Sequence, residues 1–145
     1  MRLLRDCNGA ADNVTRGRNL YAQRMDTNHL LAHVESAPRQ TFPWGALQWL
    51  CNAERMPGAL LTFGVCDLEP GQGNPRHYHP NCEEVLLALE GEGRHQIEEN
   101  WVDLKAGGLI RIPTGVRHKL INTGKTRLRC VIAFSSGTRE TVFLE

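Results

Sequence analysis

The sequence lacks any long apolar run and any cluster of charge of one sign. No stretch approaches the roughly 20 apolar residues that a membrane-spanning helix needs. The 145 residues contain 17 Lys and Arg against 16 Asp and Glu, a net charge of +1, and the basic residues are spread along the chain. We therefore expect a soluble protein with neither nucleic acid nor membrane as a partner.

We also expect neither a disulfide framework nor a secretory signal. The first ten residues carry Arg2, Arg5 and Asp6, and no apolar stretch of the kind found in signal peptides follows them. The cysteines are odd in number and include no Cys-x-x-Cys pair; they are Cys7, Cys51, Cys66, Cys82 and Cys130. This usage favours free thiols in a reducing compartment, so we expect a cytoplasmic protein.

Short apolar or alternating runs separated by Gly, Pro and Asn begin near residue 45. They predict strands at residues 45–52, 60–68, 83–90, 94–98, 101–104, 109–112, 118–122, 127–134 and 141–144. The segments between them are too short for a crossover helix, so the predicted fold class is all-β, a sandwich or barrel. Residues 1–40 are polar and are interpreted as an N-terminal arm, which leaves residues 41–145 as the barrel of a single-domain protein.

The segment from Gly71 to Gly91 reads GQGNPRHYHPNCEEVLLALEG and contains the first candidate metal ligands. Side chains two apart in a strand project to the same side, so His77 and His79 can share one ion. Pro80 and Asn81 break the strand, and the chain re-enters at Glu83 and Glu84. One of these two carboxylates can rejoin the histidine face, where a buried negative charge would require a cation.

The segment GGLIRIPTGVRHKLIN, residues 107–122, supplies a third imidazole. His118 follows a turn at residues 113–115 and begins the next predicted strand. Imidazole nitrogens combined with one carboxylate suit Fe, Mn, Ni, Co, Cu or Zn, whereas Ca and Mg prefer shells made only of oxygen. The sequence therefore predicts one divalent transition metal per chain.

Together the two segments resemble the two motifs of the cupin superfamily, and every motif position is filled. The first motif is matched by Gly71, His77, His79, Glu84 and Gly91, and the second by Gly107, Pro113, Gly115, His118 and Asn122. The resemblance implies a double-stranded β-helix, or jelly-roll, barrel in which His77, His79, Glu84 and His118 bind the metal and leave coordination positions open. It also selects Glu84 over Glu83, because the motif spacing on both sides fits Glu84.

Other polar and aromatic residues have simpler interpretations. His29, His33 and His95 are expected to be ordinary surface or arm residues, and Cys82 a small buried apolar residue. The tryptophans Trp44, Trp49 and Trp101 are expected in the core or in an interface more than in a ligand pocket. The residues that could orient a polar substrate at the barrel mouth are Arg76, Asn81, Gln48 and Arg111, although solvation explains each of them equally well.

The cupin framework supports many activities, so two functions stay open. The first is a metal-dependent enzyme, of isomerase, dioxygenase, decarboxylase or lyase type, acting on a small polar metabolite such as a sugar acid, keto acid or aromatic compound. No catalytic residue beyond the metal ligands can be named. The second is a non-enzymatic binding or sensing module in which the metal anchors a small molecule. Because Val85–Leu89 is apolar on both faces, a homodimer is expected in either case.

Overall fold

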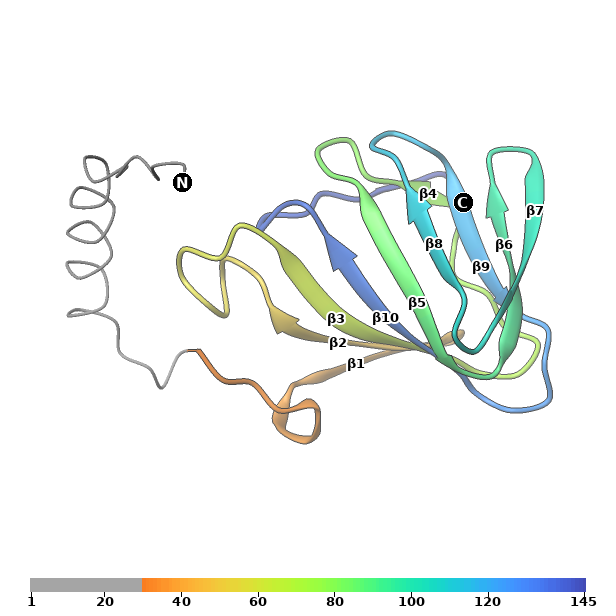
Figure 1. Ribbon diagram of the computed structural model, residues 1–145, viewed down its shortest axis with the longest axis horizontal. Helices are drawn as coiled ribbons and strands as arrows, with labels where there is room; N and C mark the ends of the chain where they lie inside the picture. Colours follow the sequence, from red (N-terminus) through yellow and green to blue (C-terminus); the bar gives the residue numbers. More distant parts are fainter. Residues whose placement is uncertain (1–29) are drawn as a thin grey trace, which may run out of the picture. The chain divides into compact units, whose positions relative to one another are not determined.

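The strands of this protein form two sheets that face each other (Figure 1). The computed structural model describes residues 30–145, and residues 32–145 form one unit, which is described by itself. A short 3-10 helix, η2 (Val34–Ser36), precedes the strands. The strands are β1 (Arg39–Phe42), β2 (Gly45–Cys51), β3 (Thr62–Leu68), β4 (His77–Tyr78), β5 (Glu84–Glu90), β6 (Glu92–Ile97), β7 (Asn100–Lys105), β8 (Leu109–Ile112), β9 (His118–Asn122), β10 (Leu128–Phe134) and β11 (Val142–Phe143).

Every strand pair is antiparallel, and the strands cross repeatedly between the sheets. One sheet has the order β1-β2-β3-β10-β5-β8, and the other has the order β11-β4-β9-β6-β7. The predicted all-β class and the jelly-roll architecture are confirmed. No helix among residues 30–145 is long and apolar enough to cross a membrane.

The core fills the space between the two sheets. β10 alternates strictly, with Leu128, Cys130, Ile132 and Phe134 buried. An alternating strand of this kind presents one apolar face to the opposite sheet. The other members of the same buried cluster are Cys66, Leu68, Cys82, Leu86, Ala88, Leu104 and Leu120. The core therefore lies directly beside the segments that carry the predicted metal ligands.

The glycines and the asparagine of the two motifs have structural roles. Gly91 has a φ of +81°, and a Cβ there would lie 2.7 Å from the Arg127 carbonyl oxygen, so both conformation and space require glycine. Asn122 is fully buried, and its Nδ2 donates to the carbonyl oxygens of Leu68 at 3.0 Å and Thr126 at 2.8 Å. These residues set the turns that return the chain to the metal-binding end.

The strand bounds agree closely with the predicted runs, with two additions. Residues 109–112 and 118–122 were predicted without error, and most of the others differ by one or two residues at an end. β1 was not predicted as a strand, and β4 was treated as part of a strand through His77 and His79 without a predicted range. β1 pairs with β2 and includes Arg39 and Gln40, the last residues of the range interpreted as an arm. Cys7, His29 and the rest of that range up to residue 29 lie outside the described residues.

Candidate metal centre

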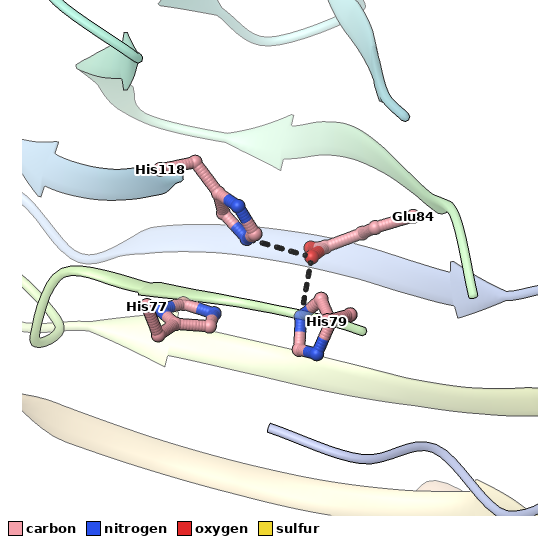
Figure 2. Close-up of side chains that lie close together, drawn as sticks. All are labelled: His77, His79, Glu84 and His118. Carbon is pink, nitrogen blue, oxygen red and sulfur yellow. Dashed lines mark hydrogen bonds and ion pairs between the residues drawn. The ribbon is translucent and has the colours of Figure 1, made fainter. Parts of the chain in front are cut away.

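Three short segments from the two sheets bring the predicted ligands together. His77 lies in β4 and pairs directly with His118, the first residue of β9. His79 follows β4, and the bend at Pro80 and Asn81 returns the chain to the opposite sheet, where Glu84 begins β5. Figure 2 shows the carboxylate of Glu84 reaching toward the rings of His79 and His118, with His77 beside them. The predicted strand break is therefore the feature that allows both sheets to contribute.

The four side chains form a buried metal-binding site. One potential ligand atom from each lies within 4.8 Å of all the others. The Oε2 atom of Glu84 is 3.2 Å from the Nε2 atom of His79 and 3.1 Å from that of His118. Each of the four residues is less than a tenth exposed. Such a separation of donor atoms leaves room for one ion between them.

The hydrogen bonds of the three rings fix which nitrogen faces the centre. The Nδ1 atoms of His77 and His118 lie 2.8 Å from the carbonyl oxygens of Pro75 and Val116, and Nδ1 of His79 lies 2.7 Å from that of Glu140. A carbonyl oxygen only accepts, so each Nδ1 carries the proton and donates. In a neutral ring the Nε2 atom then holds a lone pair, which is the form that binds a metal.

These lone pairs require a positive centre between them, either an added proton or a metal ion. Glu84 is an acceptor when ionised, and the Nε2 atoms of His79 and His118 that face it are also acceptors in the neutral rings. Burial would raise the pKa of Glu84, but when the His118 and His79 rings are protonated, their hydrogen bonds and positive charge outweigh burial and hold this pKa well below its usual range. A divalent metal fits because it accepts electron pairs from all four residues at once.

His77 is already in the state that a ligand requires. Burial lowers its pKa to about 4, and the neighbouring His118 acts in the same direction. The ring is consequently neutral at pH 7, and no proton has to leave Nε2 before a metal binds. The residues present therefore fit the expected cofactor, one divalent transition metal per chain.

A cavity of about 360 Å³ opens next to this site. All four predicted ligands line it, together with Asn74, His95, Arg139 and Thr141. The apolar part of the wall comes from both sheets and consists of Phe42, Trp44, Leu47, Trp49, Leu86, Leu120, Ile132, Phe134 and Phe143. A largely apolar cavity with a few convergent polar groups is the usual form of a small-molecule site.

The expectation that His95 is an ordinary surface residue is wrong. His95 is 1% exposed, lines the cavity and stacks against His118. Burial lowers its pKa to about 4. In β6 the buried residues alternate, and Gly93 and His95 are both buried, so strand alternation places His95 on the inner face. His33, by contrast, is exposed as expected.

The tryptophans divide between the cavity and the surface. Trp44 and Trp49 pack against the core cluster, as expected, and also line the cavity. Trp101 is 39% exposed and lies under the Arg94 guanidinium. Cys82 is 2% exposed, which confirms the buried apolar interpretation, and burial raises its pKa.

The four proposed orienting residues lie away from the cavity wall and have other partners. Arg76 contacts the Glu98 carbonyl oxygen and Glu99, and Asn81 contacts Thr138 and Glu140. Gln48 donates to the carbonyl oxygens of Val34 and Ala37, and Arg111 pairs with Glu83. Sequence reasoning missed Arg139, Asn74 and Thr141, none of which belongs to the motif positions that identified the ligands. The pairing of Glu83 with Arg111 also places Glu83 on the outer side of the strand.

Comparisons with known proteins agree with the fold and the site. Residues 64–134 match the family model described as Cupin domain. The chain is 31% identical to oxalate oxidase GF-3.8 of Triticum aestivum over 125 residues, which cover 77% of this chain and 54% of that protein. It is 34% identical to the putative germin-like protein 3-4 of Oryza sativa subsp. japonica over 100 residues, 61% of this chain and 43% of that protein.

A solved structure of an oxalate oxidase superposes with a TM-score of 0.72 at 25% identity, covering 84% of this chain and 67% of that one. The chain thus spans about half the length of the curated relatives that it matches. The residues that match the family model, 64–134, include His77, His79, Glu84 and His118.

Proposed function

Because the chain belongs to the cupin superfamily, we propose that it is a metal-dependent enzyme that acts on a small carboxylic acid. The observation that carries this proposal is the buried set of three inward-facing imidazoles and one carboxylate at the wall of a cavity. The relatives named as oxalate oxidases support a carboxylic acid as the substrate class. The proposed ligands are His77, His79, Glu84 and His118.

The chain's own residues would prepare this site in three ways. Backbone carbonyl oxygens hold the three rings so that each Nε2 faces the centre. Glu84 supplies one negative charge, which leaves a divalent ion with a net positive charge toward the cavity. The bound metal would act as a Lewis acid toward a substrate oxygen. The aromatic and aliphatic wall limits the water that competes for that oxygen.

The test combines metal analysis with a substrate screen. The protein is purified, its Mn, Fe, Co, Ni, Cu and Zn contents are measured by mass spectrometry, and the metal-loaded form is given oxalate, sugar acids, keto acids and hydroxylated aromatic acids. Oxygen consumption, carbon dioxide release and product formation are recorded. We expect turnover that is lost in His118→Ala and kept in Arg111→Gln, whose side chain is exposed and pairs with Glu83.

Two results would count against the proposal. A fully metallated protein that converts no compound of any class would contradict an enzymatic function. If a compound were retained by the protein and recovered unchanged after heat release, the chain would be a binding module instead.

A further inference from the structure

Arg139 places a positive charge in the wall of the cavity that the four proposed metal ligands line, which we call the metal cavity. It lies outside both cupin motifs, in the segment between β10 and β11. Its guanidinium carbon lies 4.5 Å from the ring centre of Trp49 and 4.9 Å from that of Phe134. Stacking uses the faces of a guanidinium group, whereas its N–H donors lie in the plane. Because the rings of Trp49 and Phe134 are inclined by 62° to each other, the guanidinium is held by two cation–π contacts and does not stack flat on both rings.

No carboxylate among residues 30–145 forms an ion pair with Arg139. Its one side-chain hydrogen bond within this range goes from Nη1 to Oγ1 of Thr141. Arg129, for comparison, pairs with Asp67 at 2.8 Å. Burial lowers the pKa of Arg139, while the charge of Glu84 acts in the opposite direction. A partly buried guanidinium with most of its donors unused is a ready partner for an anion.

The contacts of Arg139 connect it to the metal centre. Thr141, which receives its hydrogen bond, has its Oγ1 atom 3.3 Å from Nδ1 of His79. Phe134, which makes a cation–π contact with Arg139, has its ring centre 4.9 Å from that of His79. Arg139 and the four proposed ligands also line the same cavity, so one small molecule can contact both, with apolar wall around it.

Arg139 also borders a second cavity of about 220 Å³, which is lined by Asn52, Glu54, Thr62 and Trp49 among others. Glu54 is exposed in that cavity and forms no ion pair with Arg139. The metal cavity is the larger of the two and is the one with an extended aromatic wall. An anion with an apolar body therefore fits Arg139 from the metal side.

We propose that Arg139 binds the carboxylate of a ring-containing carboxylic acid whose second oxygen, a hydroxyl or carbonyl, reaches the metal. This inference rests on the proposed function and narrows its substrate class. Oxalate consists of two joined carboxylates and offers no apolar surface, so it would leave the aromatic wall of a 360 Å³ cavity without contacts. A ring between the two oxygen functions would bury apolar surface against that wall. Arg139 is thus a specificity-determining residue.

The experiment measures equilibrium binding to the metal-loaded protein by calorimetry, with three probes. The probes are 3-hydroxybenzoate, its uncharged analogue 3-hydroxybenzamide, and oxalate. We expect 3-hydroxybenzoate to bind the unmodified protein more tightly than either of the others. Arg139→Gln should weaken 3-hydroxybenzoate about 10- to 100-fold, the effect of losing a charge-assisted hydrogen bond. The same substitution should change the affinity for 3-hydroxybenzamide less than about threefold, because that probe carries no charge to pair.

Two further variants separate loss of charge from loss of structure. Arg139→Lys keeps the charge without the bidentate fork, so its affinity for 3-hydroxybenzoate should lie between those of the unmodified protein and Arg139→Gln. Arg111→Gln removes an exposed arginine outside the cavity and should bind all three probes normally. Metal content and thermal unfolding of each variant show whether the site is intact. If Arg139→Gln fails to fold, the difference between 3-hydroxybenzoate and 3-hydroxybenzamide in Arg139→Lys decides the question.

The outcomes distinguish this inference from the proposed function. If Arg139→Gln binds 3-hydroxybenzoate as tightly as the unmodified protein, or if oxalate binds best, the assignment of Arg139 is wrong even where the protein proves to be an enzyme. If 3-hydroxybenzoate binds in an Arg139-dependent way but no compound is converted, the inference stands and the proposed enzymatic function fails.

Discussion

His95 stacks against His118, with ring centres 5.7 Å apart and ring planes inclined by 17°. One of these rings belongs to the proposed metal-binding set and makes two polar contacts, to Val116 and Glu84. The other is equally buried, yet its Nδ1 atom has no hydrogen-bond partner among residues 30–145. Of these two neighbouring histidines on adjacent strands, His95 is therefore the one with a buried polar atom that lacks a partner, which is unfavourable for stability.

Replacing His95 by leucine should leave the stability of the protein unchanged or raise it by about 1 kcal/mol. The substitution removes a buried, unsatisfied nitrogen and introduces an apolar side chain of similar volume. Thermal unfolding of the metal-loaded protein measures the effect. Asn122→Leu is the matched control at another buried position, and it should lose about 2 kcal/mol or more because the Asn122 side chain bonds to three backbone groups. A large loss of stability in His95→Leu would show that His95 has a partner in solution.

Asp67 provides a test of pH dependence away from the metal. Its side chain is 1% exposed and contacts Arg39 at 2.8 Å and Arg129 at 2.8 Å. Burial would raise the pKa of Asp67, but the bonds from Arg129 and Arg39 outweigh it, and the pKa is lowered. A carboxyl group with a lowered pKa stabilises the fold above its unfolded pKa of about 3.9 and loses this effect as the pH falls through the folded pKa.

Asp67→Asn should therefore lower the free energy of unfolding by about 2 kcal/mol at pH 7, because charge-assisted hydrogen bonds are lost while the partners Arg39 and Arg129 are exposed enough to be solvated. The difference from the unmodified protein should begin to shrink as the pH falls below about 4, where the Asp67 carboxyl of the unfolded chain becomes protonated, and should disappear as the pH falls through the lower pKa of the folded state. Urea unfolding between pH 3 and pH 7 measures both effects. Asp103→Asn is the control, because its pair with Arg94 is exposed and should contribute little at any pH. A constant difference across the pH range would mean that Asp67 does not act through its charge.

The expected homodimer stays a prediction, and the outer face of β5 and β8 offers a place to test it. Leu87 pairs with Leu109 across these strands, and Leu109 and Leu89 are 60% and 47% exposed. Leu109→Lys should shift the mass measured by light scattering toward 16.3 kDa, the mass of one chain. Leu60→Lys is the control because Leu60 is 86% exposed but lies outside both strands. A mass of one chain for the unmodified protein would remove the proposal.

Much of the fold could be predicted because its information is local. Alternating burial in β10 and the turn residues around β8 and β9 follow directly from strand period and from Gly and Pro. β4 has only two residues, and its existence depends on pairing with β9 and β11, which the local sequence does not encode. β1 was missed for the same reason, since its exposed residues gain their order from β2.

The candidate site likewise contains residues that the sequence predicted and residues that it did not. The motif spacing placed His77, His79, Glu84 and His118, and the structure brings all four together. Arg139 reaches the cavity from a segment without strand periodicity, so only the three-dimensional arrangement reveals it. The burial of His95 could have been predicted, because its inward direction follows from the alternation of β6. It was not predicted because His95 belongs to no motif position.

Glu84→Gln tests whether the negative charge of Glu84 is what makes the folded protein depend on a bound metal. The substitution removes the charge and keeps the volume of the side chain. In the unmodified protein without metal, the Glu84 carboxylate faces the lone pairs of His79 and His118 at 3.2 and 3.1 Å, an arrangement that only an added proton or metal makes favourable. The glutamine amide can donate to those lone pairs. We therefore expect a chelator to lower the thermal stability of the unmodified protein and to change that of Glu84→Gln little.

The metal affinity of Glu84→Gln should fall more than about 100-fold relative to the unmodified protein, since even residues that only support a ligand contribute 10- to 100-fold. Glu83→Gln, which affects the carboxylate paired with Arg111, should keep both the metal and the response to chelator. Full metal content in Glu84→Gln, measured by mass spectrometry, would show that the ion is held without the carboxylate.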